Sequence, residues 1–148
     1  MRQLVIPQLK RKVLTTLTVT NLADLMRADE GSLPTESVRQ VTLTDVLVDT
    51  GATLLCLPER VTRQLGLKRF REVEVATAAG IKPARIFQGV HLEILGREGT
   101  FDCLELPGRQ DALLGVIPLE ALGLEPDLQN QQLRVLPITP EQTYLSAV

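Results

Sequence analysis

The stretch "VLVDTGATLLCLP", residues 46–58, places one carboxylate, Asp49, between two apolar runs. Strand interiors usually exclude aspartate, because an ionised carboxylate removed from water costs several kcal/mol unless it is paired or hydrogen-bonded. The Thr-Gly-Ala sequence that follows is typical of a turn, so we expect Asp49 at the end of a strand. An aspartate in that place is either a turn former or a catalytic group, and the tetrapeptide alone does not decide between them.

Composition limits the size and class of the protein. The chain has 148 residues and a mass of 16.3 kDa, which suits a single domain over residues 1–148, with a core of about 13–137. We expect residues 21–40 to form a long connection and residues 138–148 a tail. The net charge of −2 gives no indication of a nucleic-acid partner. No apolar segment is long enough for a membrane helix, and the N-terminus lacks a signal-peptide layout, so we expect a cytoplasmic protein with no membrane partner.

Apolar and β-branched runs predict an all-β chain with many short strands. The expected strands are residues 13–20, 38–48, 53–57, the two sides of an Ala78-Ala79-Gly80 turn between 72 and 95, 100–106, 111–116 and 131–138. The sequence "GREG" at 96–99 predicts the turn of a second hairpin. The continuous apolar residues 46–48 predict burial on both faces at that end of their strand.

One or two short helices are expected besides the strands. "PERVTRQLGL" at 58–67 has Pro58 where a first helical turn accepts proline and Gly66 where a helix ends. "PLEALGL" at 118–124 predicts a second helix that begins at Pro118. An Asn21 cap with an apolar stripe after it suggests a further short helix inside the 21–40 connection.

Two segments of the chain share one order of features. "VLVDTGATLLCLPERVTRQLGL" and "DALLGVIPLEALGL" each run from an apolar strand through a glycine to a proline-initiated helix and then Leu-Gly-Leu. The residues before the glycine are Asp49 and Thr50 in the first half, and Leu113 and Leu114 in the second. Only one half therefore carries a carboxylate at its turn.

The remaining reactive side chains suggest structural roles. Cys56 and Cys103 fit neither a disulfide framework nor a zinc spacing, so we expect buried thiols outside any disulfide. His91, within "GVHLEIL", is expected to be a half-exposed strand residue. The basic run "LKRFRE" at 67–72 is expected to be a solvated face.

Together these segments resemble the retropepsin-like aspartic peptidases, which include retroviral proteases and small bacterial relatives. The resemblance rests on "LVDTGAT" at 47–53, on the flap-like hairpin "VATAAGIKPARIF" at 75–87, and on "DALLGV" followed by "PLEALGLEPDLQNQQLRVLP". It covers about residues 38–137 in the family's order. It implies a single-domain acid-protease barrel with a flap hairpin.

The resemblance also implies peptide hydrolysis by a pair of carboxylates. Chains of this family supply one Asp-Thr-Gly each, so the second carboxylate is the Asp49 of another copy, across a two-fold axis. Two carboxylates about 3 Å apart share one proton. The ionised carboxylate activates a water, while the protonated one hydrogen-bonds the scissile carbonyl. The expected partners are a second copy and a peptide or unfolded protein, and neither a cofactor nor a metal ion is expected.

The neighbours of Asp49 receive roles from the same resemblance. Thr50 hydrogen-bonds across the dimer axis, the Gly51 N–H helps to hold the carboxylate, and Ala52 completes the active-site loop without adding a hydroxyl to the carboxylate pair. The flap residues Ala78, Ala79, Gly80 and Ile81 are expected to close over substrate. Leu114 and Gly115 are expected to pack behind the active-site loop.

Two other interpretations of the chain stay open. In the first, the chain is a non-catalytic retropepsin-fold domain that binds peptide in the cleft or serves as a structural module. In the second and weaker one, the Asp-Thr-Gly-Ala turn contacts phosphate or a metal ion, as such turns do in some nucleotide-binding folds.

Overall fold

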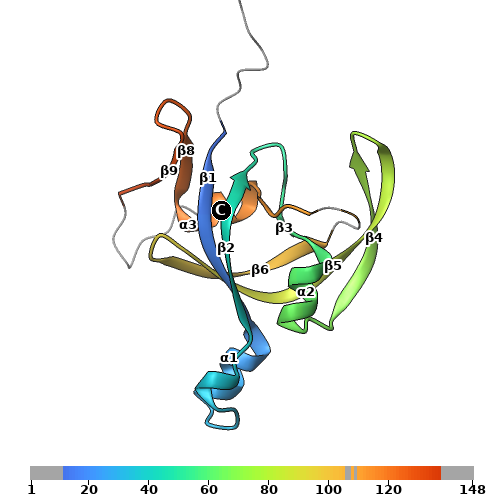
Figure 1. Ribbon diagram of the computed structural model, residues 1–148, viewed down its shortest axis with the longest axis vertical. Helices are drawn as coiled ribbons and strands as arrows, with labels where there is room; N and C mark the ends of the chain where they lie inside the picture. Colours follow the sequence, from blue (N-terminus) through green and yellow to red (C-terminus); the bar gives the residue numbers. More distant parts are fainter. Residues whose placement is uncertain (1–11, 106–107, 109, 138–148) are drawn as a thin grey trace, which may run out of the picture.

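The computed structural model describes residues 12–105, 108 and 110–137 (Figure 1). The elements in chain order are β1 (Leu14–Asn21), α1 (Leu22–Asp29), the 3₁₀ turn η1 (Thr35–Ser37), β2 (Gln40–Val48), β3 (Leu55–Leu57), α2 (Glu59–Leu65), β4 (Phe70–Thr77), β5 (Gly80–Ile94), β6 (Arg97–Glu105), β7 (Leu113–Leu114), α3 (Val116–Leu122), β8 (Leu124–Asp127) and β9 (Gln132–Val135). The expected tail over 138–148 and the end of the expected strand 131–138 lie outside the described residues. No helix of the described part has the length and apolar character needed to cross a membrane.

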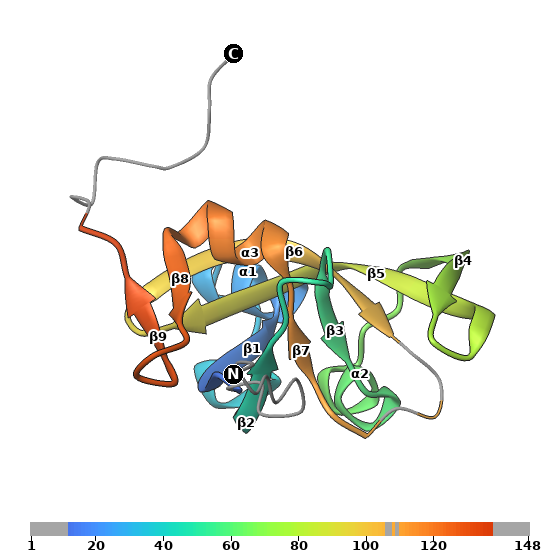
Figure 2. The same cartoon turned by 90° about the horizontal axis from the view of Figure 1, so that it is seen from above.

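The larger sheet closes on itself. Its seven strands follow the order β1-β2-β7-β3-β6-β5-β4, and β5 also pairs with β1. The ring therefore consists of β1, β2, β7, β3, β6 and β5. Strand β4 extends from it as the outer strand of a hairpin with β5 (Figures 1 and 2). An all-β chain was predicted, and the structure is mostly β. The prediction of one or two short helices is wrong in number, because the described residues contain three short α-helices.

Strand β5 is long enough to serve two parts of the fold. Its first half pairs with β4 from Gly80 to Phe87, and its second half pairs with β1 from Val90 to Glu93. The register with β6 shifts between Phe87 and Val90, where Gly89 has a φ of 84°. A glycine adopts that conformation without the steric cost of a Cβ. The bulge therefore separates the hairpin of β4 and β5 from the ring.

The connection between β1 and β2 contains the suggested helix. The Asn21 side chain accepts a hydrogen bond from the N–H of Asp24 at 3.0 Å, which caps the start of α1. The same side chain donates to the carbonyl of Leu65 at 2.7 Å. Asp24 is 2% exposed and forms an ion pair with Arg39, with 2.7 Å between Oδ2 and Nε. These contacts fix α1 at the end of the ring opposite the loop between β2 and β3 (Figure 1).

Apolar side chains from the ring strands and helices α2 and α3 form the core. Fully buried members include Leu17, Val19, Leu55, Val61, Leu65, Val90, Leu92, Cys103 and Leu114. Both cysteines are buried and neither forms a disulfide, as expected. Burial raises the pKa of the Cys103 thiol to about 12, so this group stays protonated at neutral pH.

The second half of the chain differs most from expectation. The predicted strand 111–116 contains only two strand residues, Leu113 and Leu114, and α3 begins at Val116 instead of Pro118. Helix α2 ends at Gly66 as predicted, with that residue in the left-handed conformation. Strand β8 was not predicted, because Pro126 within it is unfavourable for a strand.

The expected strand boundaries also need correction at two places. The hairpin between β5 and β6 turns at Leu95 and Gly96, and Arg97 already belongs to β6. At the end of β2, Val46 is buried but Leu47 and Val48 are only half-buried. The prediction of burial on both faces therefore holds for Val46 alone, since the last two residues approach an open surface.

Candidate active site

Asp49 stands where strand pairing ends. Residues Leu47 and Val48 of β2 pair in parallel with Leu113 and Leu114 of β7. The N–H of Asp49 still donates to the carbonyl of Leu114 at 2.9 Å, and the chain then turns, with the N–H of Ala52 donating to the carbonyl of Asp49 at 3.1 Å. The change from the apolar run to the Thr-Gly-Ala turn in the sequence therefore marks the point at which the backbone leaves the sheet.

The Asp49 carboxylate is held by one oxygen. Its Oδ1 accepts a hydrogen bond from the N–H of Gly51 at 2.9 Å, which orients the side chain. No other described residue donates to the carboxylate or pairs with it. The side chain is half-buried, and Thr50 beside it is exposed. One carboxylate oxygen is thus fixed, and the other remains available for a water, a substrate or another carboxyl group.

Gly115 and the first turn of α3 support the active-site loop, residues 49–54, from behind. A Cβ on Gly115 would lie 2.4 Å from the carbonyl oxygen of Leu54 and 2.7 Å from that of Ala52, so only glycine allows this approach. The N–H groups of Val116 and Ile117 donate at 2.9 Å to the carbonyls of Ala52 and Thr53. The first donors of the helix are satisfied by the loop, and the loop is held in place by the helix.

A cleft of about 580 Å³ opens over the carboxylate. Its lining residues come from the loop, from β3, β6 and β7, and from the hairpin of β4 and β5: Asp49, Gly51, Ala52, Thr53, Leu54, Cys56, Val75, Ala76, Thr77, Ala78, Ile86, Leu104 and Leu113. Asp49 is the only charged residue among the described residues of the lining, and most of the others are aliphatic. The hairpin faces the active-site loop across this opening (Figure 1). A largely apolar cleft with one carboxylate is suited to an extended chain with aliphatic side chains.

The tip of the hairpin is a tight turn. The Thr77 hydroxyl donates to the carbonyl of Gly80 at 2.7 Å and accepts from the N–H of Ala79 at 3.2 Å. Gly80 has a φ of 105°, and Ile81 is 69% exposed. An apolar side chain this exposed at the end of a projecting hairpin is available to contact another molecule.

Sequence reasoning placed some cleft residues and missed others. Of the expected flap residues, Ala78 lines the cleft, whereas Ala79, Gly80 and Ile81 form the exposed tip outside the lining. Leu114 is fully buried and contributes its carbonyl group. The lining residues that were not among the predicted site residues are Thr53, Leu54, Cys56, Val75, Ala76, Thr77, Ile86, Leu104 and Leu113. The alternation of β4, in which Val75 and Thr77 share a face, was the one available signal.

A second carboxylate, Glu105, is buried at the base of the hairpin. It is 3% exposed, accepts a hydrogen bond from the Thr62 hydroxyl, and lies 4.0 Å from Nε of Arg85. The Arg85 guanidinium stands over the Phe70 ring at 4.8 Å from its centroid. This cluster connects α2, β4, β5 and β6 and was not predicted from the sequence. Glu105 does not line the cleft, so we assign it to the support of the hairpin.

His91 lies in β5, far along the ring from the cleft lining. Its side chain is 19% exposed, and its Nε2 is 3.3 Å from a carboxylate oxygen of Glu98. The expectation of a half-exposed strand residue is confirmed.

Comparison with known families agrees with this geometry. A family model described as gag-polyprotein putative aspartyl protease matches residues 37–121, which is more than half of the chain. The matched range runs from the end of η1 into α3 and includes Asp49, the hairpin and Gly115. No curated protein matches the chain.

Proposed function

The chain belongs to the retropepsin-like family of gag-polyprotein putative aspartyl proteases, and we propose that it is an endopeptidase that works as a homodimer. The observation that carries the proposal is the Asp49 carboxylate, held through Oδ1 by the Gly51 N–H at the floor of the cleft. Peptide hydrolysis by this family's chemistry needs two carboxyl groups. The sequence contains one Asp-Thr-Gly, so the second group comes from a second copy.

The exposed residues around Asp49 support such a pairing. Thr50 is exposed at the turn, and its hydroxyl has no hydrogen-bond partner among the described residues. In the dimer, the two Thr50 residues hold the two active-site loops together, and the two Asp49 carboxyl groups meet at the axis. Because like charges at that separation cannot both ionise at low cost, the pair holds one proton.

Each carboxyl group then has its own task. The ionised carboxylate takes a proton from a water as the water oxygen attacks the peptide carbonyl carbon, and the protonated group donates its proton to the carbonyl oxygen. The resulting tetrahedral intermediate breaks its C–N bond when the protonated carboxyl group gives its proton to the amine nitrogen, and one hydroxyl of the intermediate returns a proton to the ionised carboxylate. The products are a carboxylic acid and an amine, and no covalent bond to the protein forms.

The hairpin of β4 and β5 completes the site in this proposal. Its residues Val75, Thr77 and Ala78 form the wall of the cleft opposite the active-site loop. A hairpin that closes over a bound peptide excludes water other than the reacting one. The turn residues Ala79, Gly80 and Ile81 would contact either the substrate or the hairpin of the partner.

A peptidase assay tests the proposal. Unfolded casein and a random peptide library are incubated with the protein from pH 3 to 7 over a wide range of protein concentrations, with and without pepstatin. A homodimeric site predicts cleavage that rises faster than linearly with protein concentration, because the active fraction depends on dimer formation. A folded monomer that cleaves nothing at any concentration would instead favour a peptide-binding or structural module.

A further inference from the structure

A basic pocket adjoins the cleft at the base of the hairpin. It has a volume of about 210 Å³ and is lined by Arg69, Phe70, Arg71, Ile86 and Gln88. Ile86 also lines the active-site cleft. The two hollows therefore meet at one side chain, and the basic pocket continues the surface on which a peptide would lie.

Strand register places the pocket and the cleft on the same face of the sheet. Arg71 pairs with Ile86 across β4 and β5, and Ile86 pairs with Leu104 across β5 and β6. Directly paired residues of antiparallel strands point to the same side, and Leu104 lines the cleft. Alternation along β4 directs Glu72 and Glu74 to the opposite face. The acidic residues of this strand are thus separated from its cleft-side arginine.

The two pocket arginines differ from four of the seven other arginines that the structure describes, because these four pair with a carboxylate. The arginines that pair with a carboxylate are Arg39 with Asp24, Arg63 with Glu59, Arg85 with Glu105, and Arg134 with Glu125. No described carboxylate lies within 4.0 Å of Arg69 or Arg71, and both side chains are exposed. Two neighbouring guanidinium groups repel one another, and an anion between them removes that repulsion.

We propose that this pocket is a substrate subsite for an acidic side chain, which makes peptides with Glu or Asp to one side of the cleaved bond preferred. The inference rests on the proposed function, because it assumes that the cleft binds peptide. A guanidinium group binds a carboxylate through two parallel hydrogen bonds, and Gln88 adds an amide donor. The basic run at 67–72, expected to be only a solvated face, thereby receives a role.

Matched peptides test the subsite. A set of Ala/Leu peptides carries a single Glu at each position in turn, and the control set carries Gln at the same positions. At one position we expect Glu to raise kcat/KM about tenfold over Gln, the gain from one hydrogen bond to a charged group. That preference should weaken in about 0.5 M salt, since the pocket is exposed. Equal rates for the Glu and Gln peptides at every position would overturn the proposal.

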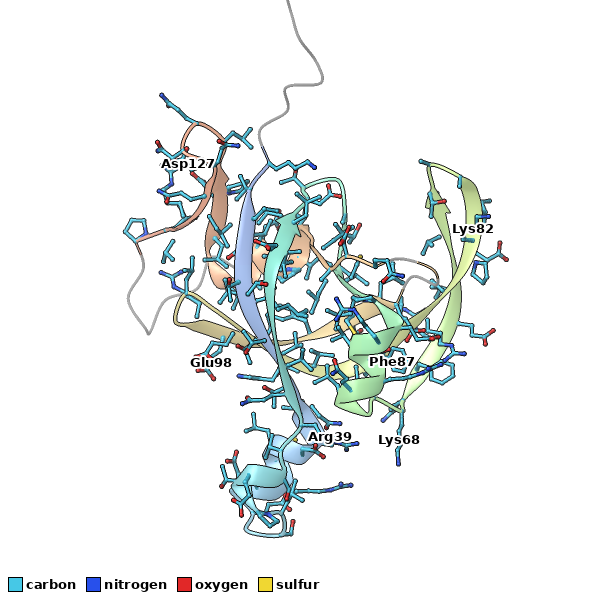
Figure 3. The ribbon with its side chains drawn as sticks, in the orientation of Figure 1. Arg39, Lys68, Lys82, Phe87, Glu98 and Asp127 are labelled. Atoms are coloured by element: carbon cyan, nitrogen blue, oxygen red, sulfur yellow. The ribbon has the colours of Figure 1, made fainter. Side chains whose placement is uncertain are left out.

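Two variants of Arg71 and one control variant test whether the preference for Glu arises in the basic pocket. Arg71→Gln should remove the preference for Glu, and Arg71→Glu should replace it with a preference for Lys at the same position. Lys68→Gln is the control, because it removes a neighbouring positive charge from a residue that lines neither the cleft nor the basic pocket. Lys68 lies at the lower end of the hairpin, and Lys82 lies in its outer half (Figure 3). Lys68→Gln should leave the preference intact. A loss in Lys68→Gln as large as that in Arg71→Gln would mean general attraction, and would contradict a subsite.

A binding measurement separates this proposal from the peptidase activity. Fluorescence anisotropy with labelled peptides is measured on Asp49→Asn protein, which keeps the pocket. Tighter binding of the Glu peptides that depends on Arg71 supports the subsite even if the wild type cleaves nothing. Cleavage by the wild type, with no preference for Glu in rate or binding, overturns the subsite and leaves the peptidase in place. If the protein neither prefers Glu peptides in binding nor cleaves any peptide, both the subsite and the proposed peptidase activity are overturned.

Discussion

The turns after β2 and β7 have similar sequences and neighbouring positions, but opposite surroundings. Asp49 and Thr50 follow β2 and are half-buried and exposed, respectively, whereas their counterparts Leu113 and Leu114 are 6% and 0% exposed. Each turn has its glycine, Gly51 or Gly115. One half of the fold presents a carboxylate to the cleft, and the other half supplies the packing that keeps this group in place. The fold therefore provides one acid per chain.

The largest expected effect is the loss of kcat/KM when the Asp49 carboxyl group is removed. Asp49→Asn should lower kcat/KM at least about 1,000-fold, because the pair loses its general base, and should leave the free energy of unfolding nearly unchanged. Asp45→Asn is the matched control, since Asp45 is exposed, lies in β2 four residues before Asp49, and has a φ of 56° that asparagine tolerates. A variant Asp49→Asn that keeps a tenth or more of the wild-type kcat/KM would show that this turn is not catalytic.

The two glycines should separate stability from activity. Gly115→Ala should lower the free energy of unfolding by about 3 kcal/mol or more, because the new Cβ meets backbone atoms of the active-site loop. The backbone of Gly115, with φ −92° and ψ −173°, is accessible to alanine, so the cost is steric. Urea unfolding of the variant measures it.

Gly51→Ala provides the contrast to Gly115→Ala. Its Cβ would lie 3.1 Å from Asp49 Oδ1, so the carboxylate must move while the core stays intact. We expect little change in the urea midpoint and a clear loss of kcat. The comparison of the halves would be wrong if Gly51→Ala unfolded the protein as strongly as Gly115→Ala.

The residues that precede the two glycines, Leu114 and Thr50, should likewise differ in their contributions to stability. Leu114→Ala removes a fully buried side chain and should cost about 3 kcal/mol of stability. Thr50→Ala removes an exposed hydroxyl and should change monomer stability by less than about 0.5 kcal/mol. Its effect should appear instead in the dimer dissociation constant, measured by sedimentation. Equal losses of monomer stability in both variants would contradict the assignment of Thr50 to the dimer axis.

The smallest expected effect concerns acid conditions, under which loss of activity could be confused with unfolding. The Arg39 side chain holds the pKa of Asp24 below its ordinary value, mainly through a hydrogen bond. A carboxyl group with a lowered folded-state pKa adds stability above its unfolded pKa, and this stability is lost as the pH falls through the folded value. The contribution should therefore begin to fall near pH 4 and continue to fall as the pH approaches the lowered pKa.

Urea midpoints of the wild type and Asp24→Asn, measured between pH 6 and pH 3, test this assignment. The wild type should lose more stability over this range than the variant, which has no carboxyl group to protonate at this position. Parallel curves would show that the Asp24–Arg39 pair does not contribute to acid sensitivity.

The first half of the chain could be predicted better than the second for physical reasons. Local signals such as the Asn21 cap, the left-handed Gly66 and the Asp49 turn depend on neighbouring residues, and each appeared where expected. The start of α3 at Val116 depends on carbonyls of Ala52 and Thr53, which are distant in sequence. No local pattern contains that information.

The site could likewise be predicted only in part. The carboxylate and its turn follow from the tetrapeptide, but the cleft wall depends on the register of β3, β5, β6 and β7. Ile86 and Leu104 are ordinary strand residues in the sequence, and their pairing alone places them beside the cleft. Glu105 was missed because its partners, Thr62 and Arg85, come from other elements.

The most direct test of the account is a mixing experiment with active and inactive chains. Wild type and Asp49→Asn are mixed at constant total concentration, allowed to exchange subunits, and assayed for peptide cleavage. If each site needs one Asp49 from each copy, activity falls as the square of the wild-type fraction, and an equal mixture keeps about one quarter of the activity. Activity that falls in simple proportion to the wild-type fraction would mean that a single Asp49 suffices, and would contradict the two-chain site.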